Sequence, residues 1–171
     1  FIKGDVRDSV ALSEAVRSVD RVVHLAAIVG APACERDHQL AEEVNVGGTQ
    51  NLIAVASKEQ AIIYASTGSN YGQVGGICTE QTSLNPLSVY GITKTKAERI
   101  IMERGNAIGY RFATAFGLSP RLRLDLLPND FVYQAVKAKT LIVYERHVRR
   151  TFIHVRDIAR ALLYAIEHFD S

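Results

Sequence analysis

Short apolar runs alternate along this chain with longer segments in which apolar residues recur every three or four positions. A continuous apolar run is typical of a strand buried on both faces, and the longer periodicity is typical of helices with one buried side. Strands that alternate with helices form parallel sheets, because each helix carries the chain back across the sheet. The pattern predicts strands at 20–26, 61–66, 107–115 and 141–144, and helices at 9–18, 35–58, 87–103, 129–139 and 155–168.

The segments between and within these elements carry further local signals. The helix at 35–58 contains Gly47-Gly48, and we expect a kink there. Residues 68–85 are rich in Gly, Ser, Thr and Asn and predict a loop, and residues 118–128 are expected to be irregular. The helix at 9–18 should bury its apolar side. That side consists of Val10, Leu12, Ala15 and Val16.

The composition is ordinary for a globular protein and gives no sign of a nucleic-acid or membrane partner. Of 171 residues, 47% are hydrophobic and 22% are charged, and the net charge is +2, which suits one well-cored domain. No apolar run has the length of a transmembrane helix, and no signal peptide is recognisable. Cys34 and Cys78 lack the spacing of metal ligands, so we expect reduced thiols in a cytoplasmic protein, with a disulfide as the alternative.

Three polar residues, Thr67, Tyr90 and Lys94, carry the candidate chemistry. Thr67 closes a buried strand, while Tyr90 and Lys94 lie four residues apart at the start of a helix and therefore on one helix face. A neighbouring ammonium can lower the pKa of a phenol from about 10 toward neutrality, so that the phenolate can take a proton from a substrate hydroxyl. Hydride transfer from a carbinol to a nicotinamide requires the loss of that proton. The alternative interpretation is that Tyr90 only packs its ring on the helix and Lys94 lies in water.

Five further motifs accompany these residues in a fixed order. Together they are similar to the motifs of the extended short-chain dehydrogenase/reductase family, in particular its nucleotide-sugar epimerases and dehydratases. The resemblance covers nearly the whole chain and implies a Rossmann-type, doubly wound parallel sheet, with NAD as cofactor and a nucleoside-diphosphate sugar as substrate. The motifs are Gly4-Asp5-Val6-Arg7-Asp8, Val22-Val23-His24-Leu25-Ala26-Ala27, Asn45-Val46-Gly47-Gly48-Thr49-Gln50-Asn51-Leu52, Ser66-Thr67-Gly68-Ser69-Asn70-Tyr71-Gly72 and Arg150-Thr151-Phe152-Ile153-His154-Val155-Arg156-Asp157.

The resemblance assigns the first cofactor contacts to two short segments. Asp5 and Val6 correspond to the residues that meet the adenine of the cofactor. Leu25, Ala26 and Ala27 correspond to the small-residue strand edge along which the dinucleotide lies. Both segments should therefore come together at one end of the sheet, where open α/β sheets bind their ligands.

Further cofactor contacts are implied closer to the reacting atoms. Asn45 is either a helix N-cap or, as in the family, a group that orders the backbone behind the cofactor. Ser66 is expected beside the cofactor, and Thr67 should hydrogen-bond the substrate oxygen beside Tyr90. Lys94 should hold the ribose hydroxyls of the cofactor and also lower the pKa of Tyr90.

We expect the Rossmann domain to be incomplete at its N-terminus. Residues 1–5 resemble a strand already under way, and the chain contains no glycine-rich turn of the kind that holds a cofactor's pyrophosphate. At least one strand–helix unit is therefore expected to be missing, and NADP is not excluded as cofactor. The resemblance divides the chain into a partial dinucleotide-binding domain at 1–117, part of a substrate-binding lobe at 118–150, and a strand and helix at 151–171 that return to the first domain.

The substrate side is implied by three more positions. Arg150 corresponds to a residue that binds the diphosphate of the sugar nucleotide, a role that suits the geometry of a guanidinium. Thr114 and Asn129 are expected near the sugar or its phosphates. We expect His24 and His154 to be satisfied core histidines rather than bases. Asp157 is expected to cap or pair near the last helix, as acidic residues in a first helical turn commonly do.

Two departures from the family narrow the chemistry. After Thr67 come Gly68 and Ser69, where a 4,6-dehydratase carries Asp-Glu and a nucleotide-sugar decarboxylase keeps a Glu. Without these carboxylates, dehydration and decarboxylation lack their acid–base group. The second departure is Thr114, which stands where epimerases commonly have Asn.

The sequence therefore predicts an NAD-dependent epimerase of a nucleoside-diphosphate sugar, with no metal site. A reductase of the same fold and a non-catalytic binding protein are the alternatives. Apolar residues spread around the helices at 35–58 and 87–103 more widely than one buried stripe requires, which predicts a homodimer.

Overall fold

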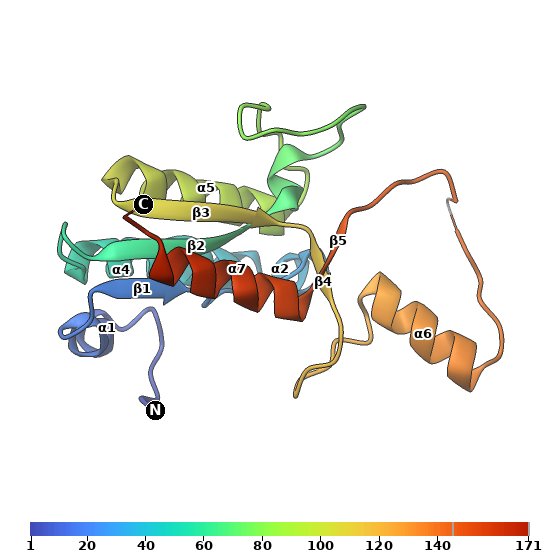
Figure 1. The fold of residues 1–171 in the computed structure, drawn as a ribbon, viewed down its shortest axis with the longest axis horizontal. Helices are drawn as coiled ribbons and strands as arrows, with labels where there is room; N and C mark the ends of the chain where they lie inside the picture. The colour runs from blue at the N-terminus through green and yellow to red at the C-terminus, as the bar shows by residue number, and fades with distance from the viewer. Residues whose placement is uncertain (145, 171) are drawn as a thin grey trace.

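The computed structural model describes residues 1–144 and 146–170. Its centre is a parallel sheet of three strands, β1 (Arg21–His24), β2 (Ala61–Thr67) and β3 (Ala107–Phe112), in the order β1-β2-β3 (Figure 1). Val22 lies opposite Ile62, and Ile62 lies opposite Ala107. Because β2 is paired on both sides and covered on both faces, it is apolar along nearly its whole length.

Helices cover both faces of β2, as expected of a doubly wound sheet. On one face Ile62 and Tyr64 pack against residues of α4 (Gly48–Val55) and α5 (Val89–Arg104). On the other face Ile63 packs against α7 (Val155–Glu167). Figure 1 shows α7 in front of the strands and α4 behind them. The predicted Rossmann-type α/β architecture is confirmed.

Helix α5 begins and ends at recognisable capping residues. The hydroxyl of Ser88 accepts a hydrogen bond from the Gly91 backbone N–H at 3.1 Å, which satisfies a free donor of the first turn. Gly105 ends the helix with a φ of 76°, in the left-handed region that favours glycine. The expected helix at 87–103 is confirmed with its ends shifted by one or two residues.

The segment expected as one helix at 35–58 is four shorter pieces. They are α2 (Ala31–Arg36), α3 (His38–Glu42), a π-helical turn η1 (Glu43–Gly47) and α4. Asp37 has an extended backbone, and its carboxylate caps α3 by accepting from the Leu40 N–H at 2.9 Å. The expectation of a continuous helix was wrong at that cap, while the kink expected at Gly47-Gly48 coincides with the end of the π turn.

The run expected as one strand at 107–115 serves two sheets. It breaks at Ala113, and β4 (Thr114–Phe116) continues into a separate parallel pair with β5 (Phe152–His154). After β4 comes α6 (Leu127–Lys137), which begins two residues earlier than expected because Pro128 suits a first helical turn. Figure 1 shows α6 set apart from the three-stranded sheet.

Two strands expected from the sequence do not form. Residues 141–144 are exposed and irregular, since the strand that pairs with β4 is β5. Residues 1–5 are also irregular and exposed, and no strand of the described chain runs beside them. An isolated apolar segment has no ladder partner, so its composition alone does not make it a strand.

The first helix, α1 (Ser9–Val16), buries less of its apolar side than expected. Val16 is buried and Leu12 is half-buried, but Val10 and Ala15 are exposed. The reason is that α1 packs mainly against α4, which covers only a narrow stripe of the α1 surface. None of the helices in the described residues is both long enough and apolar enough to cross a membrane.

Gly48 and Gly47 provide a matched test of the packing between α4 and the segment at Val6. A Cβ on Gly48 would lie 2.6 Å from Val6 Cγ2, whereas a Cβ on Gly47 would meet nothing closer than 4.0 Å. Gly48→Ala should therefore destabilise the fold by about 1–3 kcal/mol, and Gly47→Ala should be neutral or stabilise it by about 0.5–1 kcal/mol. Urea denaturation of the two variants measures this difference, and equal stabilities would contradict the packing described.

Candidate active site

The carboxyl end of β2 and the first turn of α5 bring Thr67 and Tyr90 together. Thr67 is buried, and its Oγ1 accepts a hydrogen bond from the Ser69 N–H at 3.2 Å. This bond starts the short 3₁₀ turn η2 (Gly68–Tyr71), which leads into the predicted loop. The Thr67 side chain also lies near enough to the Tyr90 phenol to lower its pKa. The two predicted hydroxyl groups therefore lie together at this end of β2.

Burial raises the pKa of the Tyr90 phenol above its usual value near 10. Hydrogen bonding by Thr67 and the positive charge of Arg123 act in the opposite direction but do not outweigh it. In this environment Tyr90 is protonated at neutral pH. A further positive influence has to act on the phenol before it can serve as a base.

Lys94 is buried between the Tyr64 ring and Glu98, so the alternative that it lies in water was wrong. Only 3% of the Lys94 surface is exposed, and its Nζ lies 4.1 Å from the centre of the Tyr64 ring. A buried ammonium is stabilised by an aromatic face and by nearby carboxylates, and Lys94 has Tyr64 and Glu98 in these roles. Burial lowers the pKa of Lys94 to about 8, and the charge of Glu98 opposes this change.

His24 is a satisfied core histidine, as expected. Its Nε2 donates to Thr49 Oγ1 at 3.0 Å, because the Thr49 hydroxyl itself donates to the Asn45 carbonyl at 2.7 Å. Burial, followed by the charge of Lys94, lowers the pKa of His24 to about 4. A neutral imidazole beside the Tyr64 ring is the consequence.

Asn45 orders the loop that follows β1, and it is not an N-cap. It lies inside the η1 turn and is buried. Its side-chain oxygen accepts from the Ile28 N–H at 2.7 Å, and its Nδ2 donates to the Ile28 carbonyl at 3.1 Å and to Thr93 Oγ1 at 3.0 Å. The loop carrying Leu25, Ala26 and Ala27 is thereby tied to α5.

Three predicted cofactor residues line one groove. Val6, Leu25 and Ala26 lie along a hollow of about 420 Å³ that follows the outer edge of β1. Most of its lining residues are apolar. Asp5 lies nearby in the chain, but its carboxylate is bound to Arg7 at 2.7 Å, a contact that lowers the pKa of Asp5 to about 2.

A buried polar cluster beneath the site was missed from the sequence. Glu98 accepts hydrogen bonds from Arg111 Nε at 2.9 Å and Nη2 at 2.6 Å, from Asn70 Nδ2 at 2.8 Å, and from the hydroxyl of Ser66. Ser66, expected beside the cofactor, is therefore engaged with α5. The signal available in the sequence was the spacing, because Lys94 and Glu98 lie four residues apart on one helix face.

The predicted substrate residues lie on other elements. Thr114 is half-buried at the start of β4. Asn129 holds two backbone groups, accepting from the Gly117 N–H at 3.1 Å and donating to the Arg123 carbonyl at 2.9 Å. Arg150 is exposed in the segment before β5.

Two residues near the last helix have structural contacts. His154 is half-buried and caps α7 by accepting from the Arg156 N–H at 3.2 Å, so it is an N-cap rather than the core histidine expected. Asp157 pairs with Arg160 at 3.4 Å, as expected of an acidic residue in the first turn.

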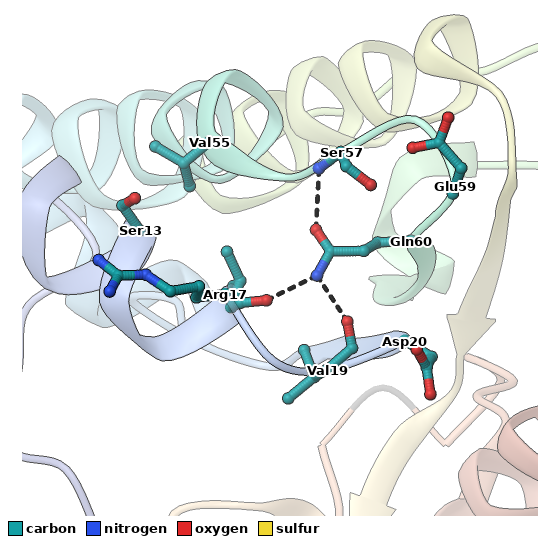
Figure 2. Close-up of a pocket in the computed structure, with 9 residues that line it drawn as sticks. Ser13, Arg17, Val19, Asp20, Val55, Ser57, Glu59 and Gln60 are labelled. Atoms are coloured by element: carbon teal, nitrogen blue, oxygen red, sulfur yellow. Dashed lines mark hydrogen bonds between the residues drawn. The ribbon is translucent and has the colours of Figure 1, made fainter.

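A polar pocket of about 370 Å³ lies at the opposite end of the sheet (Figure 2). Its central side chain is Gln60, which donates to the carbonyls of Val16 and Val19 at 2.6 Å and accepts from the Ser57 N–H at 2.8 Å. Gln60 precedes β2, whereas Thr67 ends it. The pocket is therefore separate from the site at Tyr90.

The sequence matches the family described as "NAD dependent epimerase/dehydratase family" over residues 1–171. The chain belongs to this family. It is 30% identical over 160 residues to a Bacillus subtilis (strain 168) protein named "Uncharacterized UDP-glucose epimerase YtcB", covering 88% of this chain and 50% of that protein. It is 27% identical over 172 residues to the UDP-glucose 4-epimerase of Rickettsia canadensis (strain McKiel), covering 98% of this chain and 47% of that enzyme.

Solved structures of the epimerase/dehydratase family have the same fold. UDP-glucuronic acid 4-epimerase from Bacillus cereus, in complex with UDP-glucuronic acid and NAD, superposes with a TM-score of 0.84 at 30% identity, covering 98% of this chain and 55% of that one. MoeE5, in complex with UDP-glucose and NAD, gives a TM-score of 0.84 at 28% identity, covering 99% and 59%. The chain spans about half the length of the curated relatives described.

The buried Lys94 should make stability depend on pH. Its folded-state pKa of about 8 lies below the unfolded value of 10.5, so the folded chain binds fewer protons between these pH values and its stability rises with pH through that window. Relative to Lys94→Met, the gain should reach about 3 kcal/mol near pH 10.5. Urea denaturation of both proteins from pH 7 to 10.5 measures it. A stability difference that stays constant over this range would rule out a buried, depressed Lys94.

Proposed function

We propose that the protein is an NAD-dependent epimerase of a nucleoside-diphosphate sugar. The observation that carries this proposal is the placement of buried Thr67 at the carboxyl end of β2, beside the first turn of α5 with Tyr90, and of buried Lys94 one helical turn further along α5. This arrangement can hold a sugar hydroxyl and move its proton. Family membership and the similarity to UDP-sugar 4-epimerases support the same reaction.

In the proposed reaction, Tyr90 takes the proton of a sugar hydroxyl while Thr67 hydrogen-bonds the same oxygen. A bound NAD would supply the acceptor for the hydride from the sugar carbon and the donor for its return. The keto sugar turns over between the two transfers, and Tyr90 gives the proton back to the oxygen. The net reaction is an isomerisation, because the proton and the hydride both return to the sugar.

Lys94 is the group that we assign to the activation of Tyr90. Burial raises the pKa of the phenol, so a base at this position needs a nearby positive charge. We propose that the Lys94 ammonium would hold the ribose hydroxyls of the cofactor and would act on Tyr90. The groove at Val6, Leu25 and Ala26 supports the placement of the rest of the cofactor, with Asp5 and Ala27 beside it and Asn45 behind it.

The missing carboxylates favour epimerisation over related reactions. Gly68 and Ser69 follow Thr67 and cannot serve as the acid–base pair of a dehydratase. The alternative reductase would consume reduced cofactor stoichiometrically, and a binding protein would turn nothing over. Incubating the full-length protein with a panel of sugar nucleotides and following NADH absorbance separates these activities. Epimer formation without net NADH is the expected result, and stoichiometric NAD(P)H consumption would identify the reductase.

We propose that residues 118–150 belong to a substrate lobe and that the protein works in the cytoplasm as a homodimer through α5 and the segment at 31–55. The apolar residues Ile92 and Met102 are exposed on α5, which supports a contact there. Sedimentation of the full-length protein at micromolar concentration decides between dimer and monomer.

Tyr90→Phe should reduce turnover by at least about 10²-fold, the usual scale for a positioned acid–base group. Only a hydroxyl is lost, so the fold should persist. Tyr164→Phe is the matched control, because Tyr164 is exposed on α7 and the variant should keep its activity. Initial rates and thermal unfolding curves of both variants measure the effect. Near-normal turnover in Tyr90→Phe would remove Tyr90 from the reaction.

Arg150→Ala tests the proposed diphosphate contact. Loss of a charge-assisted contact worth roughly 1.5–3 kcal/mol should raise KM for the sugar nucleotide about ten- to a hundredfold, with a smaller change in kcat. The adjacent Arg149→Ala is the control and should behave like the unsubstituted protein. Titration calorimetry distinguishes the sites: weakened NAD binding with unchanged sugar-nucleotide binding would assign Arg150 to the cofactor instead.

A further inference from the structure

We propose that Glu98 is a positioning residue of the active site, which fixes the end of β2 against α5 and supplies the negative charge that acts on Lys94. The effect of Glu98 on catalysis rests on the proposed function. The contacts of Glu98 do not rest on it, because all of them lie within the described residues.

Glu98 is buried, with 6% of its surface exposed, and residues from three other elements hold it. Arg111 comes from β3, Ser66 from β2 and Asn70 from η2, while Glu98 itself belongs to α5. Asn70 Nδ2 also donates to the Ser66 hydroxyl at 2.9 Å. Ser66 precedes Thr67 directly, so the cluster fixes the backbone from which Thr67 reaches Tyr90.

A second contact extends the cluster into the active-site loop. Arg111 Nη1 donates to the Tyr71 hydroxyl at 3.1 Å and to the Glu80 carbonyl at 3.2 Å. These bonds tie the loop after η2 to β3. Loss of the Glu98 carboxylate would leave Arg111, whose guanidinium stays charged, without its anionic partner.

The charge of Glu98 also reaches Lys94, four residues earlier on the same helix face. Three other titratable groups lie around this part of α5: His24 from β1, Tyr64 from β2 and Tyr90 from α5 itself. His24 is neutral, and burial keeps both phenols protonated. Among these groups, Glu98 is the anion that favours the charged form of Lys94.

The test uses Glu98→Gln in the full-length protein, with Glu103→Gln as control, since Glu103 is exposed on the same helix. NMR titration of the labelled Lys94 side chain should show its midpoint falling by about one pH unit in Glu98→Gln, as expected on removing an opposite charge. The kcat should fall about 10- to 100-fold, the cost of a small misplacement, with KM changing less. The alkaline limb of the kcat–pH profile should move down with the Lys94 midpoint. Glu103→Gln should change none of these values.

A double variant, Glu98→Met with Arg111→Met, separates positioning from stability. Replacing a buried ion pair by apolar residues of similar size is often neutral for folding. The double variant should therefore unfold at no lower a temperature than Glu98→Gln, yet keep the low Lys94 midpoint and the low kcat. Normal kcat in the double variant, or an unchanged Lys94 midpoint in Glu98→Gln, would overturn the proposal. If the unsubstituted protein epimerises no sugar nucleotide, the proposed function fails, and the Lys94 midpoint still decides the role of Glu98.

Discussion

The carboxylate of Glu98 lies buried between α5 and the end of β2, and a charge in that place has to be neutralised. Arg111 does this from β3 with two guanidinium nitrogens, at 2.9 and 2.6 Å, and Ser66 and Asn70 fill further acceptor sites. Because these partners come from separate elements, the ion pair and its hydrogen bonds tie α5 to β2, β3 and η2. The same helix face carries Lys94, and the start of the helix carries Tyr90. The proposed acid–base group therefore lies on a helix that this interaction fixes to the end of β2.

A second constraint is the burial of the Lys94 ammonium. The Tyr64 ring and the nearby charge of Glu98 partly offset the loss of hydration of the ammonium. Burial nevertheless lowers the pKa of Lys94 to about 8. A lysine with this pKa is mostly charged at neutral pH. A charged ammonium suits the proposed role of binding the hydroxyls of a cofactor.

The sequence predicted those parts of the fold that depend on local pattern. The run at 61–66 forms β2, and Ser88 and Gly105 cap the two ends of α5. The failures were of two kinds. The apolar stretch at 141–144 has strand composition but no pairing partner, because β5 occupies the edge of β4. Asp37 ends one helix and caps the next, although the apolar periodicity continues through it. Periodicity alone does not show whether such a residue lies inside a helix or caps a new one.

In the site, too, the sequence predicted what depends on local motifs and missed what depends on contacts between distant segments. Family-like motifs placed Thr67 and Tyr90 together, and in the structure the Thr67 side chain lies near enough to the phenol to lower its pKa. The cluster around Glu98 was not predicted, because its members are distant in sequence and meet only after the strands have paired in register. The packing of Lys94 was not predicted for a related reason: an i, i+4 spacing identifies a helix face but not the ring of Tyr64 that lies beneath it.

In the proposed reaction a hydride leaves the sugar and returns to it within one active site. Epimerisation in D₂O by the full-length protein, with mass spectrometry of the product, tests this step. The inverted carbon should carry no deuterium, because the hydrogen removed there is the one returned. Deuterium from solvent at that carbon would show proton exchange through a carbanion or enol and would contradict the proposed reaction.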